Sequence, residues 1–207
     1  MLAALGLLVG GLDNTRVFVA EVLPAVGGGT LYYENQTPYA LFGRLLATDL
    51  RDNGLDARYP ERLVALLARG VALLVILVSA LIIRRGGGGT LGAALRLAML
   101  IAASLLVIPT AWSIYITWLV LPLAILGIAI VREPLPWSVV ACFAVAAILL
   151  PFGVERTVWG AGPHDGAIRL VLSYKVYGVA ALWAGAALAA RALAAADEAK
   201  EVAWSGT

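Results

Sequence analysis

The chain has 207 residues, of which 62% are hydrophobic and only 14% are charged, against about 25% charged residues in soluble domains. Too few charges remain to cover a compact body in water, which excludes a soluble enzyme, a nucleic-acid-binding protein and a secreted disulfide scaffold and indicates an integral membrane protein. The formal net charge is +2, and the single cysteine, Cys142, allows no internal disulfide, so we predict no metal site, no cofactor and no nucleic-acid partner.

The chain begins with residues 1–12, which are apolar but shorter than the roughly 20 residues that a spanning helix needs. This stretch also lacks the basic start and the small-residue cleavage site of a signal peptide. We therefore expect the end of a transmembrane helix whose beginning is missing. The chain would then be a fragment, or the second half of a larger enzyme.

A long extracytoplasmic loop is predicted for residues 13–61. Connections of this length are usually functional or disordered, and this one is not of low complexity. Within it, apolar residues recur at helical spacing between Leu41 and Leu46, with Thr37 placed to cap the helix and Pro38 at its first position. We expect a short amphipathic helix on the outer membrane surface.

Five later stretches are long enough, or nearly so, to cross a bilayer as helices, because a helix satisfies its own backbone polar groups in lipid. They run from about Arg62–Ile83, Thr90–Ile108, Ser113–Val131, Pro136–Phe152 and Ala167–Ala194. The fold class expected from this pattern is all-α: a polytopic bundle of five spans over residues 62–194, followed by a polar cytoplasmic tail at 195–207.

The basic residues between the spans predict the orientation of the bundle. Arg84, Arg85 and Arg132 lie in short turns, which places these turns and both termini in the cytoplasm by the positive-inside rule. The outward-facing segments would then be Asp13–Glu61, Pro109–Trp112 and Gly153–Gly166. Abundant Ala, Gly and Arg with little Lys suggests a multi-pass protein of a bacterial plasma membrane.

Three basic side chains inside the predicted spans need explanation, because ionisable residues there are expensive and are functional candidates by default. Arg96 lies six residues from the cytoplasmic end of its span, from where it can reach the inner headgroups. Lys175 lies about eight residues into the last span, or about 12 Å deep, between two tyrosines. Arg69 lies about seven residues into the first of the five spans. Lys175 and Arg69 could each hold a lipid-linked phosphate. Alternatively, each side chain could extend along its aliphatic part so that its charged end reaches the membrane interface.

Aromatic and titratable residues mark two of the predicted outer turns. Trp112 and Tyr115 follow Pro109 at interfacial depth, where they could form a stacking wall for a sugar or simply an aromatic belt. His164 and Asp165 are adjacent in the last loop, where they could relay a proton or merely be solvated.

The order of these motifs resembles glycosyltransferase family 87. Glu34-Asn35-Gln36-Thr37 with the downstream Arg44 is similar to the family's Asn-Gln-Ser motif and its arginine. The stretch from Ile108 to Tyr115 resembles the family's Ser-Pro-x-Ser-Trp turn, although Ser113, Ile114 and Tyr115 stand where acidic and histidine residues are common. The resemblance covers this chain but only the C-terminal half of a typical member.

The resemblance implies a partial GT-C architecture and transfer of mannose or arabinofuranose from a polyprenyl-phosphate carrier to a cell-envelope glycolipid or glycan. It implies that Asn35, Gln36 and Arg44 line the outward donor site with Trp112 beside it. It places the catalytic base upstream of this chain. Within the chain, the candidates for a base are Glu34, His164 and Asp165.

The chemistry of such a transfer matches the residue types available. Cations suit the phosphate, whose charge grows as the glycosidic bond breaks, and carboxamides suit sugar hydroxyls because each both donates and accepts. The first hypothesis is therefore a membrane glycosyltransferase or its C-terminal half, with the lipid bilayer, the lipid-linked donor and the glycan acceptor as partners. The alternatives are a non-catalytic subunit or degenerate paralogue, which a partner chain would complete, and, less favoured, a transporter of the same lipids.

Overall fold

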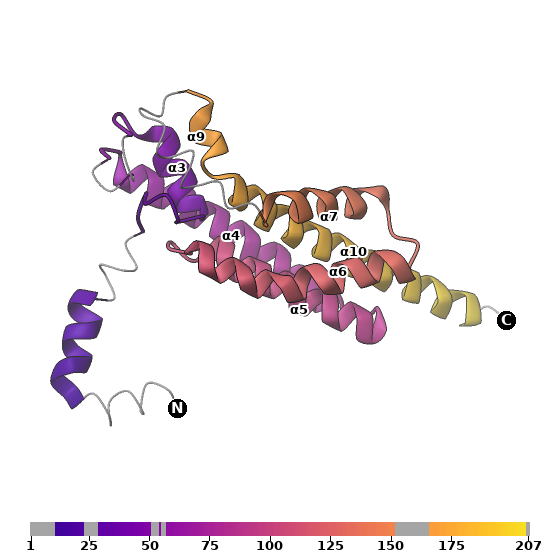
Figure 1. Ribbon diagram of the computed structural model, residues 1–207. Helices are drawn as coiled ribbons and strands as arrows, with labels where there is room; N and C mark the ends of the chain where they lie inside the picture. Colours follow the sequence, from indigo (N-terminus) through magenta and orange to yellow (C-terminus); the bar gives the residue numbers. More distant parts are fainter. Residues whose placement is uncertain (1–10, 23–28, 51–53, 55–56, 152–165, 206–207) are drawn as a thin grey trace.

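The architecture is that of a computed structural model, which describes residues 11–22, 29–50, 54, 57–151 and 166–205 (Figure 1). Within these ranges the chain forms helices and no strands, apart from one isolated bridge between Asp49 and Arg58. The predicted all-α class is confirmed. The elements after the helical residues 11–17 are η1 (Phe18–Val22), α3 (Pro38–Leu46), α4 (Glu61–Arg85), α5 (Gly89–Val107), η2 (Ser113–Leu119), α6 (Val120–Arg132), α7 (Trp137–Leu149), α9 (Ile168–Val171) and α10 (Tyr174–Ser205).

Four helical segments are long and apolar enough to cross a membrane: Glu61–Arg85, Gly89–Val107, Ile114–Arg132 and Tyr174–Lys200. The sequence analysis expected five. The difference is α7, which has only 13 residues and spans about 20 Å of a hydrocarbon core of about 30 Å. Prolines bound it at both ends, because Pro136 occupies the N-cap and Pro151 has no backbone N–H with which to continue the helix.

The long helix α10 forms the centre of the bundle and packs mainly against α5 and α7. Small side chains let these helices approach closely, as Ala98 of α5 and Ala186 of α10 are both fully buried. The outer face of α4 carries large apolar side chains four residues apart, at Leu73, Leu77 and Leu81, each more than half exposed. Such a stripe is suited to contact with lipid.

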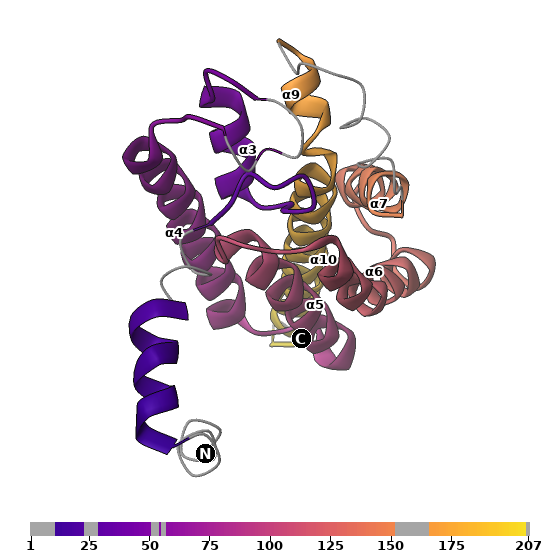
Figure 2. The same ribbon diagram turned by 60° about the vertical axis from the view of Figure 1, so that its left-hand side comes forward.

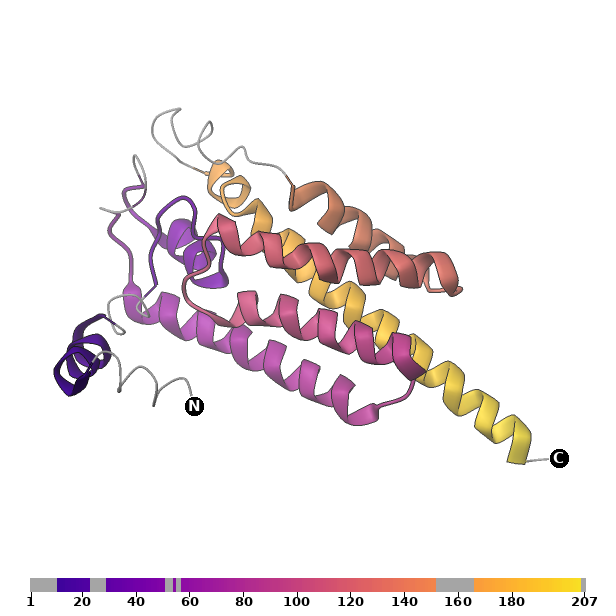
Figure 3. The same cartoon turned by 60° about the horizontal axis from the view of Figure 1, so that its bottom comes forward.

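Successive long helices run in opposite directions, so the connections gather at two ends of the bundle (Figure 3). One end holds α3, the turn that follows α5 and the short helix α9, and Figure 2 shows α3 between the ends of α4 and α9. The opposite end holds the turn after Arg84 and Arg85, the turn after Arg132 and the end of α10 (Figure 1). The turn regions assigned to the outer side by sequence therefore share one end, as far as the structure describes them.

A four-glycine turn joins α4 to α5 at the end that holds Arg84 and Arg85. Gly86 to Gly89 all have positive φ between 56° and 75°, a region that glycine occupies without steric cost. The backbone N–H of Gly88 donates to Oδ2 of Asp197 in α10 at 2.7 Å, and Arg96 donates to the carbonyl oxygens of Gly86 and Gly87. Arg96 is thus used to close the turn of its own hairpin.

The last predicted span differs from the structure at both ends. Residues 167–194 were expected to form one helix, but α9 ends at Val171 and α10 begins only at Tyr174. The carbonyl oxygen of Leu172 accepts from the side chains of Gln36 and Arg44, and this geometry interrupts the helical ladder. Beyond residue 194, α10 continues to Ser205 through alanine, glutamate and lysine, which favour helix, so the predicted tail is helical as far as Ser205.

The first segment also extends beyond its predicted boundary at residue 12. Residues 11–17 are helical and η1 continues to Val22, because the apolar and polar residues after Leu12 contain no proline or glycine before position 23. Residues 1–10, where the rest of the expected helix end lies, are outside the described residues.

Candidate functional site

Helix α3 begins as its sequence predicts. Thr37 is the N-cap, with its hydroxyl accepting from the backbone N–H of Ala40 at 3.3 Å, and Pro38 occupies the first turn. The same hydroxyl donates to the carbonyl oxygen of Pro109 at 3.1 Å. The cap therefore does two things: it starts α3 and it fastens α3 to the turn after α5.

Asn35 extends this fastening. Its carboxamide Nδ2 donates to the carbonyl oxygens of Thr30 at 2.7 Å and Pro109 at 3.1 Å, and its Oδ1 accepts from the backbone N–H of Ala111 at 2.9 Å. The side chain is 1% exposed. All of these partners are backbone groups, so Asn35 substitutes for a backbone pairing between two loops that lie about 75 residues apart.

Gln36 and Arg44 connect α3 to the break between α9 and α10. Gln36 Nε2 donates to the carbonyl oxygens of Tyr33 and Leu172, at 3.0 and 3.1 Å. Arg44, which is 0% exposed, donates to the carbonyl oxygen of Leu172 at 3.1 Å and to Oγ of Ser173 at 2.8 Å. The two side chains converge on the same carbonyl.

Arg44 also binds the loop before α3. Its Nη1 makes the two contacts with Leu172 and Ser173, whereas its Nη2 donates to the carbonyl oxygens of Tyr32, Tyr33 and Asn35, at 2.8, 3.2 and 2.8 Å. Carbonyl dipoles therefore surround the buried cation, which offsets part of its desolvation cost. We call Asn35, Gln36, Thr37 and Arg44 together the polar clamp, because they join three chain segments at one end of the bundle.

The sequence analysis missed Arg169, which reinforces the clamp from α9. Its guanidinium donates to the carbonyl oxygens of Arg44 and Ala47, at the C-terminal end of α3. A cation at that position also complements the negative end of the helix. No local signal in the sequence marks this role, because the partner carbonyls lie more than 120 residues away.

Three buried polar atoms in or beside the clamp lack a hydrogen-bond partner among the described residues: Oε1 of Gln36, Nε of Arg44 and the hydroxyl of Tyr177. The amide oxygen is an acceptor, Nε is a donor, and the hydroxyl can act as either. Buried polar groups of this kind are commonly satisfied by an internal water molecule.

An aromatic surface covers the clamp on the outside. Trp112, 40% exposed, lies 5.5 Å from Tyr32 between ring centroids, and Tyr32 lies 4.5 Å from Tyr33. Hydrogen bonding with Tyr32, followed by desolvation and the nearby carboxylate of Glu34, raises the pKa of Tyr33 to about 12. The half-buried Glu34 therefore lies within reach of this surface.

The remaining predicted site residues fall in different places. Tyr115 pairs with Trp118, at 5.2 Å between ring centroids, rather than with Trp112. Lys175 is the second residue of α10 instead of eight residues deep, and it is 5% exposed with its ammonium 5.7 Å from the centroid of the Tyr174 ring. The helical break at Leu172 and Ser173 separates Lys175 from the residues that were expected to precede it in one continuous span.

Arg69 lies at a pocket of about 210 Å³ between α3, α4 and the end of α5. Its guanidinium is exposed and has no hydrogen bond or ion pair with any residue that the structure describes. Tyr39 and Pro109 line the same pocket, and Pro109 is the residue whose carbonyl the clamp holds. The pocket residues are Pro38, Tyr39, Ala65, Ala68, Arg69, Ala72, Leu106, Val107, Ile108 and Pro109.

His164 and Asp165 lie outside the described residues. The described part of the chain contains no group of three or more His, Cys, Asp or Glu side chains that could hold a metal ion. Comparisons with protein families, with curated proteins and with solved structures found no match to this chain.

Proposed function

We propose that this chain is a membrane glycosyltransferase, or the C-terminal half of one, that takes a sugar from a polyprenyl-phosphate carrier. The observation that supports this best is the pocket beside Arg69. It combines an exposed cation that has no partner among the described residues with apolar walls, on a helix whose outer face is suited to lipid. A phosphate on a long apolar chain needs both features at once.

In this proposal Arg69 contacts the phosphate of the donor. A guanidinium can donate two parallel hydrogen bonds to phosphate oxygens, and it favours the transition state because negative charge accumulates on the leaving phosphate. The apolar carrier would lie along α4, whose exposed face carries leucines at regular spacing. The sugar would extend from the phosphate toward the aromatic surface of Tyr32 and Trp112.

The polar clamp acts in this proposal by positioning. Asn35 and Thr37 hold the carbonyl of Pro109, and Pro109 and Tyr39 are walls of the pocket. Arg44 and Gln36 hold the loop that presents Tyr32 and Tyr33. The clamp thereby fixes the distance between the pocket and the aromatic surface. Productive transfer requires this distance to be held to within about 1 Å, because a larger misplacement of the reacting groups slows the reaction strongly.

The transfer itself breaks the bond between the anomeric carbon and the phosphate oxygen and forms a bond to an acceptor hydroxyl. The proton of that hydroxyl passes to a base, and the phosphate leaves on its carrier. Glu34 is the carboxylate of the described residues that lies beside the aromatic surface. A segment or partner chain outside this sequence could supply the base instead, as the resemblance implies.

A second function is supported by the burial of the clamp. Asn35, Gln36 and Arg44 are at most 3% exposed, and their hydrogen bonds stabilise the fold rather than face a cavity. This arrangement also suits a non-catalytic subunit or degenerate paralogue that binds the carrier and contributes a pocket wall to a partner chain. Binding without transfer separates this candidate from the first.

The test measures donor binding and sugar transfer separately on the purified protein in detergent micelles. The probe for binding is a short-chain polyprenyl phosphate, and the probe for transfer is radiolabelled polyprenyl-phosphate mannose or arabinofuranose with native membrane lipids as acceptors. Arg69→Gln should weaken binding at least tenfold. The matched control is Arg62→Gln, which removes an exposed arginine from the same end of α4 without touching the pocket.

The outcomes divide the candidates. Binding lost in Arg69→Gln and retained in Arg62→Gln, together with transfer by the wild type, supports the enzyme. The same binding pattern without transfer supports the non-catalytic subunit. Equal binding by both variants would contradict the phosphate role of Arg69, and no binding by the wild type would contradict both functions.

A further inference from the structure

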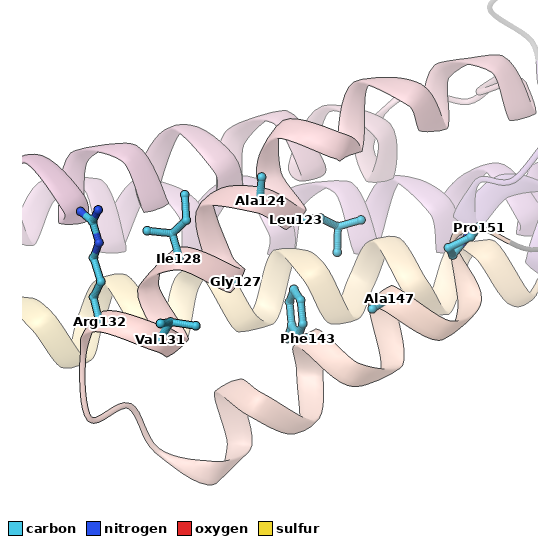
Figure 4. Close-up of a pocket in the computed structure, with 9 residues that line it drawn as sticks. All are labelled: Leu123, Ala124, Gly127, Ile128, Val131, Arg132, Phe143, Ala147 and Pro151. Atoms are coloured by element: carbon cyan, nitrogen blue, oxygen red, sulfur yellow. The ribbon is translucent and has the colours of Figure 1, made fainter.

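A second cavity, larger than the first, lies between α6 and α7 (Figure 4). Its volume is about 640 Å³, and eight of the nine residues that line it are apolar or glycine. These are Leu123, Ala124, Gly127, Ile128, Val131, Phe143, Ala147 and Pro151, and the ninth is Arg132. The groove does not involve the polar clamp or the pocket of Arg69.

The groove exists because small residues of α6 face the short helix α7. Gly127 of α6 lies against the ring of Phe143 of α7, and a Cβ added at Gly127 would lie 3.5 Å from the nearest ring atoms. Ala124 and Ala147 leave further space on either side, on α6 and α7 (Figure 4). Since both helices belong to a bundle suited to a membrane, this space is accessible from the lipid.

The length of the groove matches one leaflet of a bilayer. From Leu123 to Arg132, helix α6 rises about 14 Å, while half of a hydrocarbon core is about 15 Å. Arg132 stands at one extremity of this row and Pro151 near the other (Figure 4). A chain that fills the groove would therefore reach from the bilayer centre to the interface at the Arg132 end.

The guanidinium of Arg132 determines the chemistry of the occupant. It is exposed, and no side chain or backbone group of the described residues pairs with it. Arg84 and Arg85 lie at the same end of the bundle, and Trp137, 78% exposed, begins α7 there. An unpaired cation at the interfacial end of an apolar groove complements an anionic headgroup on an acyl chain.

We propose that the groove between α6 and α7 binds one anionic phospholipid, with an acyl chain along Gly127 and Phe143 and its phosphate on Arg132. The phosphate end of this site lies at the end of the bundle opposite to α3, and the groove shares no lining residue with the pocket of Arg69. It is therefore separate from the donor pocket, and the proposal does not depend on the glycosyltransferase function. The lipid would also cover the face where α7 is too short to reach across the bilayer.

Lipid retention measured by native mass spectrometry tests this site. The purified protein in micelles is incubated with dioleoyl phosphatidylglycerol or, at equal concentration, with dioleoyl phosphatidylcholine. We expect the wild type to retain one phosphatidylglycerol molecule in preference to phosphatidylcholine. Arg132→Gln should weaken that retention about tenfold, which corresponds to about 1.4 kcal/mol, and should leave phosphatidylcholine unaffected.

Two matched pairs make the test specific. Arg84→Gln removes an exposed arginine from the same end but outside the groove, and it should retain the lipid. Ala124→Phe fills the groove and should lose the lipid, whereas Ala144→Phe adds the same ring to an exposed position of α7 outside it. Circular dichroism of each variant confirms that the helices are intact.

Three results would overturn the proposal. Equal losses in Arg132→Gln and Arg84→Gln would show a general effect of surface charge. Unchanged retention in Ala124→Phe would show that the lipid lies elsewhere. A dimer of this chain that Ala124→Phe dissociates would show that a second copy occupies the groove.

Discussion

Replacing Arg44 by methionine should destabilise the protein without touching any exposed surface. The substitution keeps a long, unbranched side chain of similar reach but removes every donor of the guanidinium. Five hydrogen bonds to four backbone carbonyls and one hydroxyl are lost. The carbonyls of Leu172 and Tyr33 retain Gln36 as a donor, and that of Tyr32 retains the backbone N–H of Asn35. The groups left unsatisfied are therefore the carbonyl of Asn35 and the hydroxyl of Ser173.

Two opposing contributions set the magnitude. An unsatisfied buried acceptor costs about 1–3 kcal/mol, so two of them cost about 2–6 kcal/mol. Removing the cation recovers the energy spent on burying it, and relaxation or water entry recovers part of the rest. No buried charge is left uncompensated, so the net loss expected is about 2–4 kcal/mol. For a chain of this size, that corresponds to a fall of about 4–16 °C in Tm.

The assay is thermal unfolding in detergent micelles, followed by circular dichroism and tryptophan fluorescence. Arg69→Met is the matched control, since Arg69 is exposed and lacks a partner in the described part of the chain. It should change stability by no more than about 0.5 kcal/mol. Arg44→Lys should fall between the two, because one ammonium cannot occupy the positions of both guanidinium nitrogens.

A specific result would refute this reasoning. If Arg44→Met unfolds within about 0.5 kcal/mol of Arg69→Met, the clamp does not stabilise the fold. If Arg44→Met is stable but no longer binds polyprenyl phosphate, Arg44 contacts the donor directly, as the resemblance to glycosyltransferase family 87 implies. A loss of both stability and binding is expected if Arg44 positions the pocket.

Three further predictions test other parts of the structure. Gly87→Ala should destabilise the protein more than Gly86→Ala in the same thermal assay. Both glycines have positive φ, 73° and 63°, but only the Cβ at Gly87 would lie 3.0 Å from Ala194 in α10. Equal losses would argue against close packing of this turn on α10. Asn35→Leu should cost about 2–4 kcal/mol, because the carbonyl of Thr30 and the N–H of Ala111 lose their partner while the carbonyl of Pro109 retains the Thr37 hydroxyl. A neutral effect would contradict the role of Asn35 in joining these loops. The Tyr33 phenol should ionise near pH 12 in ¹³C-tyrosine NMR, and Glu34→Gln should lower that pKa toward 10. Because the pKa of Tyr33 is higher in the folded state, the protonated phenol stabilises the fold below pH 10, and this stabilisation is lost as the pH rises through 12.

The parts of the fold that sequence predicts are those that depend on local chemistry. The membrane helices follow from composition and from backbone satisfaction in lipid. Helix α3 follows from an N-cap threonine, a proline at the first position and a helical repeat, and the structure contains it at Pro38–Leu46. The Gly86–Gly89 turn follows from residue type, since only glycine tolerates four successive positive φ angles.

The clamp could not be predicted in the same way. The sequence marks Asn35, Gln36 and Arg44 as candidates, but the distant carbonyl and N–H groups that they bind lie 74 to 136 positions away and carry no side-chain signal. The same contacts explain the error in the last span. The apolar run through Leu172 is typical of a continuous helix, and only the tertiary hydrogen bonds to its carbonyl account for the break.

The arginines show how much a charge near a membrane depends on its partners. Sequence reasoning treats every such cation as a functional candidate. In the structure, Arg44, Arg96 and Arg169 donate to backbone carbonyls at a helix end or a turn, so their charge contributes to the fold. Arg69 and Arg132 are exposed, line separate cavities and have no partner among the described residues. A phosphate would supply what these two lack, and because the two arginines lie at opposite ends of the bundle, our two proposals place two phosphates on two different lipids.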